Sequence, residues 1–398
     1  MEIKERQINI CIHICHVLPF LILFFLPVLP SFAEQLHHLD SQEPLVPSLV
    51  ESIRFSKPLF FCGSKIKTDE QSVRERLEKE VLLALWDRPQ VILWLKRASK
   101  FFPHMEEIIR QAGLPDDLKY VAVIESGLRP HVSSHKGAVG YWQFLRSTGR
   151  MYGLKINAHV DERRDLFKST KSACRYLKEL NRQFDDWFLA VAAYNMGARG
   201  LKNQIKIQES YDFYSLYLSE ETQRYVFKII AAKYIMENFS KFGFVFSRED
   251  YYPLFKFDRI TINSPRELPI TLVAKAAGVS FKTVKDYNPH LRGYKLDRGV
   301  SSILIPKGLL GHFEENFKEY YGKWLASKNG RSGKQDRLKV PLDAGIHDTR
   351  IHKVRSGENL ALIAKKYNIR LSSLMKWNNL SSGSTIYPGD KLIVDQNR

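Results

Sequence analysis

Helical periodicity without competing strand alternation restricts the fold of this chain most strongly, and it extends from Thr68 to Phe242. Apolar residues recur there at three- and four-residue spacing, which is typical of amphipathic helices. The predicted helices share a Thr, Pro, Asp or Ser at the first residue or just before it. They cover 68–86, 89–100, 103–111, 165–184, 186–196 and a segment that begins after Ser219. We therefore expect one all-helical domain at 68–245, with its core at 103–242.

A second feature is an internal repeat at an offset of 90 residues, after Tyr251. A repeat of this kind indicates two copies of one structural unit. Each copy ends in a strand-like run, at 302–305 and 391–394. The matching segments are 273–275 with 363–365, 279 with 369, 281 with 371, 284 with 374, and 287–288 with 377–378.

These copies predict two small modules, at 256–307 and 351–395. The segment 308–350 between them is interpreted as a helix followed by a linker. Its stretch 326–340 is rich in Lys, Arg, Ser and Gly, a composition typical of flexible chain. The expected fold class is therefore mainly α, with a helical domain followed by small modules.

The N-terminus has the pattern of an export signal. No Asp, Glu, Lys or Arg occurs from Gln7 to Ala33, and the apolar core from Val17 to Leu29 is too short for a comfortable membrane span. Small residues at Ser31 and Ala33 predict cleavage after Ala33. We expect residues 1–33 to be a signal peptide, 34–67 to be an extended lead-in, and the protein to reach the periplasm or cell envelope. The alternative is an uncleaved N-terminus that associates with the membrane.

The formal net charge of +18 favours a polyanionic partner. Nucleic acid, anionic lipid and cell-wall polymers all satisfy that condition, and charge alone does not choose among them. No nucleic-acid-binding motif is recognisable, and the export pattern favours the cell wall. No His/Cys cluster has the spacing of metal ligands, so neither a metal nor another cofactor is expected. Cys174 lies on an apolar helix face and is interpreted as a buried thiol, although a Cys62–Cys174 disulfide stays open.

The strongest candidate for acid–base chemistry is Glu125. Leu118, Val121 and Ala122 occupy positions i, i+3 and i+4 of a predicted helix, and Glu125 follows at i+7 on the same apolar face. A carboxylate that faces an apolar surface loses hydration, and its pKa rises. A raised pKa is what a general acid near neutral pH requires. Taken alone, Glu125 would more often pair with an Arg or cap a backbone group.

Two further segments carry side chains suited to sugars. In 137–143, glycines permit a tight turn or close approach of substrate, Trp142 offers a flat apolar face, and Gln143 offers both a donor and an acceptor. Tyr194 and Asn195 stand at the predicted end of a helix. Tyr194 could equally belong to the core, and Asn195 could equally be a helix-terminus residue.

Together these segments resemble the soluble-lytic-transglycosylase-like (goose-lysozyme-like) family, and within it the branch of membrane-bound lytic transglycosylase D. The resemblance covers roughly 103–242, with a weaker likeness upstream to Thr68. It implies a lysozyme-like helical fold with one catalytic carboxylate, Glu125. Tyr141 and Trp142 depart from the Leu-Met of many members. The motifs are Glu125-Ser126, Gly140-Tyr141-Trp142-Gln143, Ala193-Tyr194-Asn195 and Glu221-Thr222-Gln223-Arg224-Tyr225-Val226.

The same resemblance implies roles for other residues. Ser134 falls where the family places a serine near the substrate N-acetyl group, and Gln143 matches a glycan-contacting Gln. Tyr194 and Asn195 match a pair that lines the cleft, and Tyr225 matches a tyrosine close to the catalytic carboxylate.

Residues 352–394 resemble a LysM module, through Val354-Arg355-Ser356-Gly357-Glu358-Asn359-Leu360, Trp377-Asn378 and Tyr387-Pro388-Gly389-Asp390. The resemblance implies a βααβ fold and a glycan ligand that contains N-acetylglucosamine. Its candidate contacts are Ser356, Gly357, Leu380 and Ser381. The earlier copy keeps the core pattern but lacks both turn motifs, so we interpret it as a degenerate, structural LysM-like module.

The resulting hypothesis is a peptidoglycan lytic transglycosylase, a lyase that cleaves the MurNAc–GlcNAc β-1,4 bond without water and leaves 1,6-anhydro-MurNAc ends. Its partner would be the glycan strands, with LysM anchoring it to the wall. A goose-type muramidase is the first alternative, and it would need a second carboxylate to activate water. Asp161, Glu162, Asp165 and Glu221 are the candidates for that role. A non-catalytic wall-binding protein is the second alternative.

Overall fold

The computed structural model describes residues 47–329, 351–355, 357–378, 380, 384 and 386–394. The predicted signal peptide, and the predicted linker from residue 330 onward, lie outside the described residues. So do two of the predicted LysM contacts, Ser356 and Ser381. In the described part, no helix combines the length and apolar character needed to cross a membrane.

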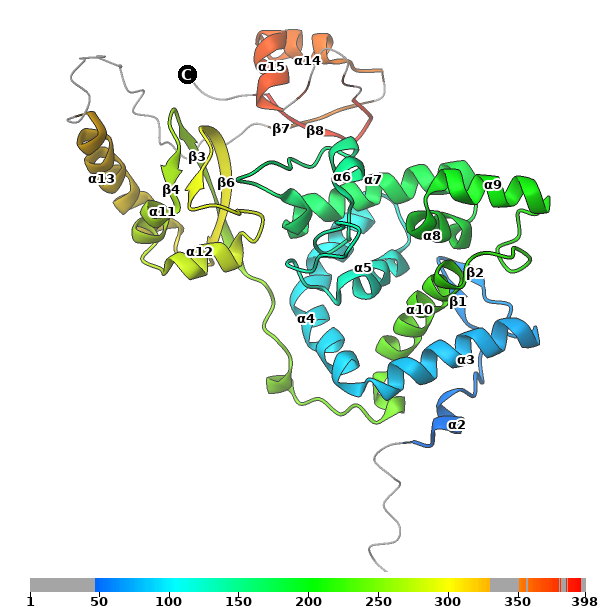
Figure 1. Cartoon of the computed structure of the whole chain (residues 1–398). Helices are drawn as coiled ribbons and strands as arrows, with labels where there is room; N and C mark the ends of the chain where they lie inside the picture. Colours follow the sequence, from blue (N-terminus) through cyan, green and yellow to red (C-terminus); the bar gives the residue numbers. More distant parts are fainter. Residues whose placement is uncertain are drawn as a thin grey trace, which may run out of the picture. The chain divides into compact units, whose positions relative to one another are not determined.

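Helices build almost all of the first domain, as the periodicity predicts (Figure 1). The one strand pair before the first long helix is a short hairpin, β1 (Phe60–Phe61) with β2 (Ser64–Lys65). The helices are α2 (Leu49–Ser52), α3 (Gln71–Trp86), α4 (Arg88–Gln111), α5 (Lys119–Ser126), α6 (Arg146–Met151), α7 (Leu166–Phe184), α8 (Trp187–Met196), α9 (Ala198–Gln208) and α10 (Glu220–Glu237). Single 3-10 turns lie at Asp116–Leu118, Glu162–Arg164, Phe239–Phe242 and Arg248–Asp250.

Side-chain caps place the starts of the later helices close to the predicted positions. Asp165 accepts a hydrogen bond from the Lys168 amide at 2.8 Å and begins α7, and Asp186 caps α8 in the same way. Ser219 begins α10, which confirms the predicted cap. These caps satisfy amide groups that have no partner inside the helix.

The separate helices predicted over 89–100 and 103–111 are wrong, because α4 runs unbroken from Arg88 to Gln111 with Pro103 inside it. Proline removes one amide donor from the helix ladder, which normally favours a break. Here the amide of Phe255 donates to the carbonyl of Lys100 at 3.1 Å, so a distant segment supports the backbone beside the proline. Phe101 and Phe102 before the proline, and Met105 and Ile109 after it, are buried in the same core, which holds both halves of the helix.

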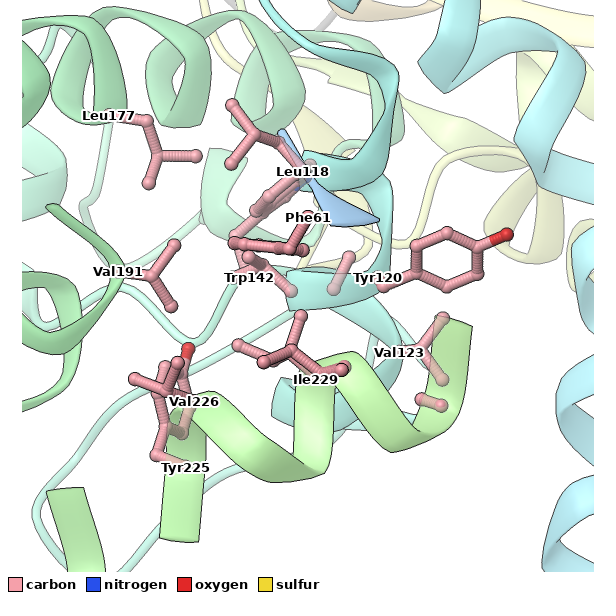
Figure 2. Close-up of a cluster of buried hydrophobic side chains, with 14 of the residues drawn as sticks. Phe61, Leu118, Tyr120, Val123, Trp142, Leu177, Val191, Tyr225, Val226 and Ile229 are labelled. Atoms are coloured by element: carbon pink, nitrogen blue, oxygen red, sulfur yellow. The ribbon is translucent and has the colours of Figure 1, made fainter. Parts of the chain in front are cut away.

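The core of the helical domain surrounds α8, whose residues from Phe188 to Ala193 are all buried. α7 and α10 pack against α8, and α10 also packs against α3 and α5. The predicted apolar face of α7 and that of α10 are both buried, and Cys174 is a buried free thiol. Figure 2 shows side chains from α5, α7, α8 and α10 meeting around Trp142. Cys62 is also free, so the disulfide left open by the sequence is absent from the described residues.

The two repeat copies share a βααβ frame, which confirms the small α+β modules, and the first copy adds the short strand pair β4–β5. Each unit pairs its first and last strands antiparallel; in the first copy Asp258 stands opposite Ile305. The first copy contains β3 (Phe257–Ser264), β4 (Leu268–Pro269), α11 (Ile270–Ala276), α12 (Phe281–Tyr287), β5 (Lys295–Leu296) and β6 (Gly299–Pro306). The second contains β7 (Ile351–Lys353), α14 (Leu360–Lys366), α15 (Leu371–Trp377) and β8 (Lys391–Ile393).

A long helix after the first unit, α13 (Leu310–Asn329), packs on α11. Phe313 and Phe317 on its first half are buried in the apolar cluster of this unit. The first unit also bonds to the helical domain through its backbone. The amide of Asp161 donates to the carbonyl of His290 at 2.8 Å, and the amide of Arg292 donates to the carbonyl of His159 at 2.7 Å.

One asparagine in each copy explains why the repeat retains this residue type. The Asn288 amide donates to the carbonyls of Val284 and Leu304 and accepts from the Leu304 amide, at 2.7–2.8 Å. Asn378 makes the equivalent three bonds to Leu374 and Ile393. The side chain therefore joins the end of the second helix to the last strand in both modules.

We predict that Asn288→Ala opens this joint, because it leaves the buried Leu304 amide and carbonyl without partners. Buried unsatisfied groups cost about 1–3 kcal/mol each. Peptides that cover β6 should exchange their amide hydrogens faster in hydrogen-exchange mass spectrometry, while peptides from α7 keep their protection. Asn316→Ala, which removes an exposed bond to the His312 carbonyl, is the control. Unchanged exchange in β6 would contradict this role.

Candidate active site

Glu125 lies in the last turn of α5, a helix of eight residues that is buried along most of its length. Leu118, Val121 and Ala122 are all buried, which confirms the predicted apolar face. Gly127 ends the helix in the left-handed conformation, with φ of 56°. α5 thus holds Glu125 through a rigid and buried backbone.

The carboxyl group of Glu125 is half-buried and has one hydrogen-bond partner in the described part of the chain. The Tyr225 hydroxyl on α10 donates to Oε1 at 2.5 Å. Burial raises the pKa of Glu125 from 4.5 to about 7, and the hydrogen bond from Tyr225 opposes part of this rise. No ion pair of Glu125 is found among the described residues, so the more usual role of an Arg-paired glutamate does not apply.

Two tyrosines stand beside this carboxyl group. Burial raises the pKa of Tyr225 and of Tyr194 well above the usual value, and the charge of Glu125 adds to both rises. Both phenols therefore stay neutral and keep their protons for donation. The hydroxyl of Tyr194 donates to the Trp142 carbonyl at 2.6 Å, which fixes the backbone directly before Gln143.

A row of aromatic rings extends from Tyr194, and the sequence interpretation missed it. The ring centroid of Tyr176 lies 5.2 Å from that of Tyr194, and the centroid of Tyr152 lies 4.9 Å from that of Tyr176. Tyr152 and Tyr176 are half-buried. Their signal in the sequence is weak, because Tyr176 occurs inside an ordinary amphipathic helix.

The segment between α5 and α6, residues 127–145, carries Gln143 and is held from several sides. The Ser126 hydroxyl donates to the Tyr141 carbonyl at 2.9 Å. Arg163 donates through Nη1 to the carbonyls of Gly137 and Phe144, both at 3.0 Å. Gln143 itself donates to two backbone carbonyls, at 2.9 and 3.1 Å. We call this segment the pinned loop.

A close approach does require a glycine in this loop, but the approaching group is protein backbone. At Gly140, with φ of 87°, an added Cβ would lie 1.9 Å from the Arg163 carbonyl oxygen. The space beside Gly140 is filled by the backbone of Arg163, so this glycine serves the packing of one chain segment on another and not the close approach of substrate. Gly140 thus lets the pinned loop lie directly on the turn at 162–164.

The interpretation of Trp142 as a flat surface for sugar rings is wrong. Trp142 has 0% exposure, and its indole N–H donates to the Thr170 hydroxyl at 3.0 Å. Tyr141 is also buried. The Tyr-Trp pair therefore fills the core under the pinned loop, and only Gln143 of this motif keeps partial exposure.

Asn195 and Ser134 have different surroundings. The Asn195 Oδ1 accepts from the Thr222 hydroxyl at 2.9 Å, which connects the end of α8 to the start of α10. Ser134 is exposed, and its Oγ accepts from the Ala138 amide at 3.1 Å inside the pinned loop. The charge of Glu125 acts on both Tyr194 and Tyr225, so these three residues form one cluster. The bond of Ser134 lies within its own turn and does not connect it to that cluster.

Three of the four acids proposed as a second carboxylate serve the structure. Asp161 pairs with Arg163 at 2.8 Å and is buried, and Glu162 pairs with Lys168 at 2.6 Å. Asp165 caps α7. The fourth, Glu221, lies exposed in the first turn of α10. No group of three or more His, Cys, Asp or Glu that could hold a metal occurs among the described residues.

In the C-terminal unit, two of the four predicted contacts can be placed. Gly357 has φ of 85° and forms the turn before α14. Leu380 is half-buried and packs on the apolar cluster of the unit. The turn is fixed by Glu358, which accepts from the Arg355 amide at 2.7 Å and from His352 at 2.6 Å.

Comparison with known families assigns three domains. Residues 106–216 match the transglycosylase SLT domain, and residues 256–322 match the LysM-like domain of lytic transglycosylase MltD. Residues 352–395 match the LysM domain. The second match reaches into α13, consistent with the packing of that helix on α11.

Among curated proteins, the chain is 32% identical over 304 residues to membrane-bound lytic murein transglycosylase D of Escherichia coli strain K12, and equally to that of strain O6:H1. The aligned region covers 75% of this chain and 64% of each relative. The chain thus spans somewhat less than two thirds of the length of these relatives.

Among solved structures, the 70 kDa soluble lytic transglycosylase of Escherichia coli is 17% identical with a TM-score of 0.33, covering 47% of this chain and 34% of that one. An inactive mutant of the lytic transglycosylase Slt of Pseudomonas aeruginosa is 21% identical with a TM-score of 0.29, covering 39% and 26%.

We predict that Glu125→Gln stabilises the protein above pH 7. The unfolded chain loses the Glu125 proton above about pH 4.5, whereas the folded chain keeps it up to about pH 7. The folded state therefore binds more protons in this window, and wild-type stability falls as pH rises through it. The full effect is up to about 3 kcal/mol for a pKa rise of this size.

Urea unfolding of wild type and variant at pH 4 and pH 8 tests this. The two should match at pH 4, and the variant should have the higher midpoint at pH 8. Glu221→Gln, at an exposed position, should show no such pH-dependent gain. Equal midpoints at pH 8 would mean that burial of Glu125 is less complete than described.

Proposed function

We propose that this protein is a lytic transglycosylase of peptidoglycan. Its domain matches support this: a transglycosylase SLT domain at 106–216, an MltD LysM-like domain at 256–322 and a LysM domain at 352–395. It would cleave the MurNAc–GlcNAc β-1,4 bond and leave 1,6-anhydro-MurNAc ends. The observation that carries this proposal is Glu125, a half-buried carboxyl group whose pKa is raised to about 7 and which accepts a hydrogen bond from Tyr225.

The first step needs a proton donor. Protonated Glu125 gives its proton to the bridging oxygen, and the bond from that oxygen to C1 of MurNAc breaks. The positive charge that develops at C1 is stabilised by the N-acetyl group of the same sugar. A pKa near the working pH supports this role, because an appreciable fraction of the carboxyl groups carries the proton while transfer remains favourable.

The second step needs a base, and the same residue supplies it. The Glu125 carboxylate removes the proton of the C6 hydroxyl, whose oxygen attacks C1 and closes the anhydro ring. The proton lost in the first step is thereby recovered, and no water is consumed. The hydrogen bond from Tyr225 stabilises the carboxylate form of Glu125, which is the form that acts as base in this step.

Several neighbours are assigned to the glycan. Gln143 is held by two backbone carbonyls, which gives its amide a defined position for a sugar hydroxyl. Asn195 uses Oδ1 for Thr222, so its Nδ2 is the donor that we assign to the N-acetyl carbonyl. Ser134 is the alternative for that contact. Tyr194 positions the pinned loop and adds an apolar wall beside Glu125.

The muramidase alternative needs a second carboxylate, and the described contacts favour it less. Asp161 and Glu162 are engaged in ion pairs, and Asp165 caps a helix. Only Glu221 is uncommitted among the four, and it is exposed. A single carboxyl group that acts twice therefore explains the site more simply. A non-catalytic wall-binding protein would have no need for a glutamate whose pKa is raised to about 7.

The C-terminal domain is proposed to hold the enzyme on its substrate. Its candidate contacts remain Ser356, Gly357, Leu380 and Ser381. We also propose export by cleavage after Ala33, which would place the enzyme at the peptidoglycan in the periplasm. Retention of the N-terminus would add membrane association.

We expect Glu125→Gln to abolish anhydro-muropeptide release from purified sacculi, because the amide can neither donate the proton nor remove one. Loss of a residue that acts both as general acid and as base should lower the rate by at least the roughly 100- to 10,000-fold effect that is typical of one such role. Mass spectrometry of the released products is the measurement, and Glu75→Gln, at an exposed position on α3, is the matched control. Reducing ends in place of anhydro ends would favour the muramidase, and activity retained by the variant would remove Glu125 from the mechanism.

The pH profile of kcat/KM should depend on the hydrogen bond from Tyr225 to Glu125. Since the first step needs protonated Glu125, kcat/KM should fall as pH rises through about 7. Tyr225→Phe removes a bond that lowers the pKa, so this fall should move to higher pH. Tyr120→Phe, which removes a similar tyrosine–carboxyl bond to Glu237, should leave the profile in place. An unmoved profile in Tyr225→Phe would show that another group controls the fall.

A further inference from the structure

A cavity of about 740 Å³ lies beside the pinned loop and is strongly basic. It has six cationic side chains and one acidic side chain in its lining. The lining residues are Lys136, Gly137, Val139, Leu145, Arg146, Ser147, Arg150, Asp161, Arg163, Arg164 and Arg292. We call it the arginine cavity.

The single acid does not neutralise these cations. Both oxygens of Asp161 are engaged by Arg163, at 2.8 and 2.9 Å, and both residues are buried. Arg150 donates to the Ile156 carbonyl at 2.7 Å. Within the described residues, the side chains of Arg146 and Arg292 have neither a hydrogen-bond partner nor an ion pair, and both are exposed.

Arg164 is an independent indication that the cavity favours an anion. Its side chain is 20% exposed, and its Nε is buried without a hydrogen-bond partner. The Asp161 carboxylate lies 3.9 Å from that nitrogen, too far for a hydrogen bond. Its Nη1 contacts the ring of His131 at 3.1 Å. A buried guanidinium N–H without a partner is costly, and an anion would remove that cost.

The cavity is connected to the candidate catalytic site through shared backbone. Gly137 and Val139 line it and belong to the pinned loop, which also carries Gln143. Gly140 rests on the Arg163 carbonyl, and Arg163 holds two carbonyls of the same loop. A glycan strand that contacts Gln143 would therefore lie near the arginine cavity.

We propose that the arginine cavity binds a carboxylate of the peptide stems carried by peptidoglycan glycan strands. This inference rests on the proposed function, which brings such strands to Glu125. Guanidinium groups match planar carboxylates through paired hydrogen bonds. Arg146 and Arg292 approach from the helical domain and the LysM-like unit respectively, so the site needs both parts of the chain. The cavity would make the enzyme prefer strands that still bear their peptides.

The test compares two substrates with the full mature chain. One is glycan strands with stem peptides, and the other is the same strands after removal of the peptides by an amidase. The variant is the double change Arg146→Gln with Arg292→Gln. The double change Lys178→Gln with Lys206→Gln removes the same charge from exposed positions on α7 and α9 and is the control.

The arginine variant should lose about tenfold in kcat/KM on peptide-bearing strands, mainly through KM, as expected for loss of hydrogen bonds to a charged group. It should match wild type on strands without peptides, and the control should match wild type on both. Equal loss on both substrates would indicate a structural role, and no loss on either would exclude the cavity from binding. Both results overturn the proposal.

Inorganic phosphate separates a carboxylate site from a general anion site. If phosphate inhibits the wild type equally on both substrates and does not inhibit the arginine variant, the cavity is a phosphate site. That result would overturn the peptide proposal.

A wild type that cleaves neither substrate would instead overturn the proposed function. In that case, co-sedimentation of wild type and arginine variant with peptide-bearing strands decides the inference: weaker binding by the arginine variant alone supports it, and equal binding overturns it.

Discussion

The contact between the half-buried Glu125 carboxyl group and the Tyr225 hydroxyl is the constraint on which the candidate active site depends. Desolvation pushes the pKa of Glu125 upward, and the Tyr225 hydroxyl pulls it partly back. The balance leaves the group near pH 7, where it can both give and take a proton. Glu125 comes from α5 and Tyr225 from α10, so this balance exists only when those helices are packed together.

Other residues fix the pinned loop, which carries Gln143. Ser126 and Arg163 hold the pinned loop by its carbonyls, and Tyr194 holds it at Trp142. Three of the four acids that might have supplied a second catalytic carboxylate are engaged in structural contacts. Asp161 is an example, because its charge is needed to keep Arg163 buried beside the loop.

The two repeat copies show how the same joint can be kept while surfaces diverge. Asn288 and Asn378 make equivalent bonds, so both copies preserve the βααβ frame. The first copy has gained α13 as an additional layer and bonds to the helical domain near His290. The second retains the Gly357 turn expected of a glycan-binding module.

The sequence by itself determined the helical domain, the repeat and the position of Glu125, because these depend on local periodicity and on motifs of adjacent residues. Capping residues such as Asp165 and Ser219 also placed helix starts well, since a cap acts within three residues. The proximity of Tyr225 to Glu125 was anticipated only through the family resemblance, and the hydrogen bond between them was not predicted.

Tertiary structure decided the rest, because those features depend on contacts between distant segments. α4 continues through Pro103 with support from Phe255, which no local rule contains. Trp142 turned inward to Thr170, although its neighbours in sequence gave no sign of the direction. Arg146 and Arg292 are far apart in the sequence, and only folding makes them line one cavity, where their charges add.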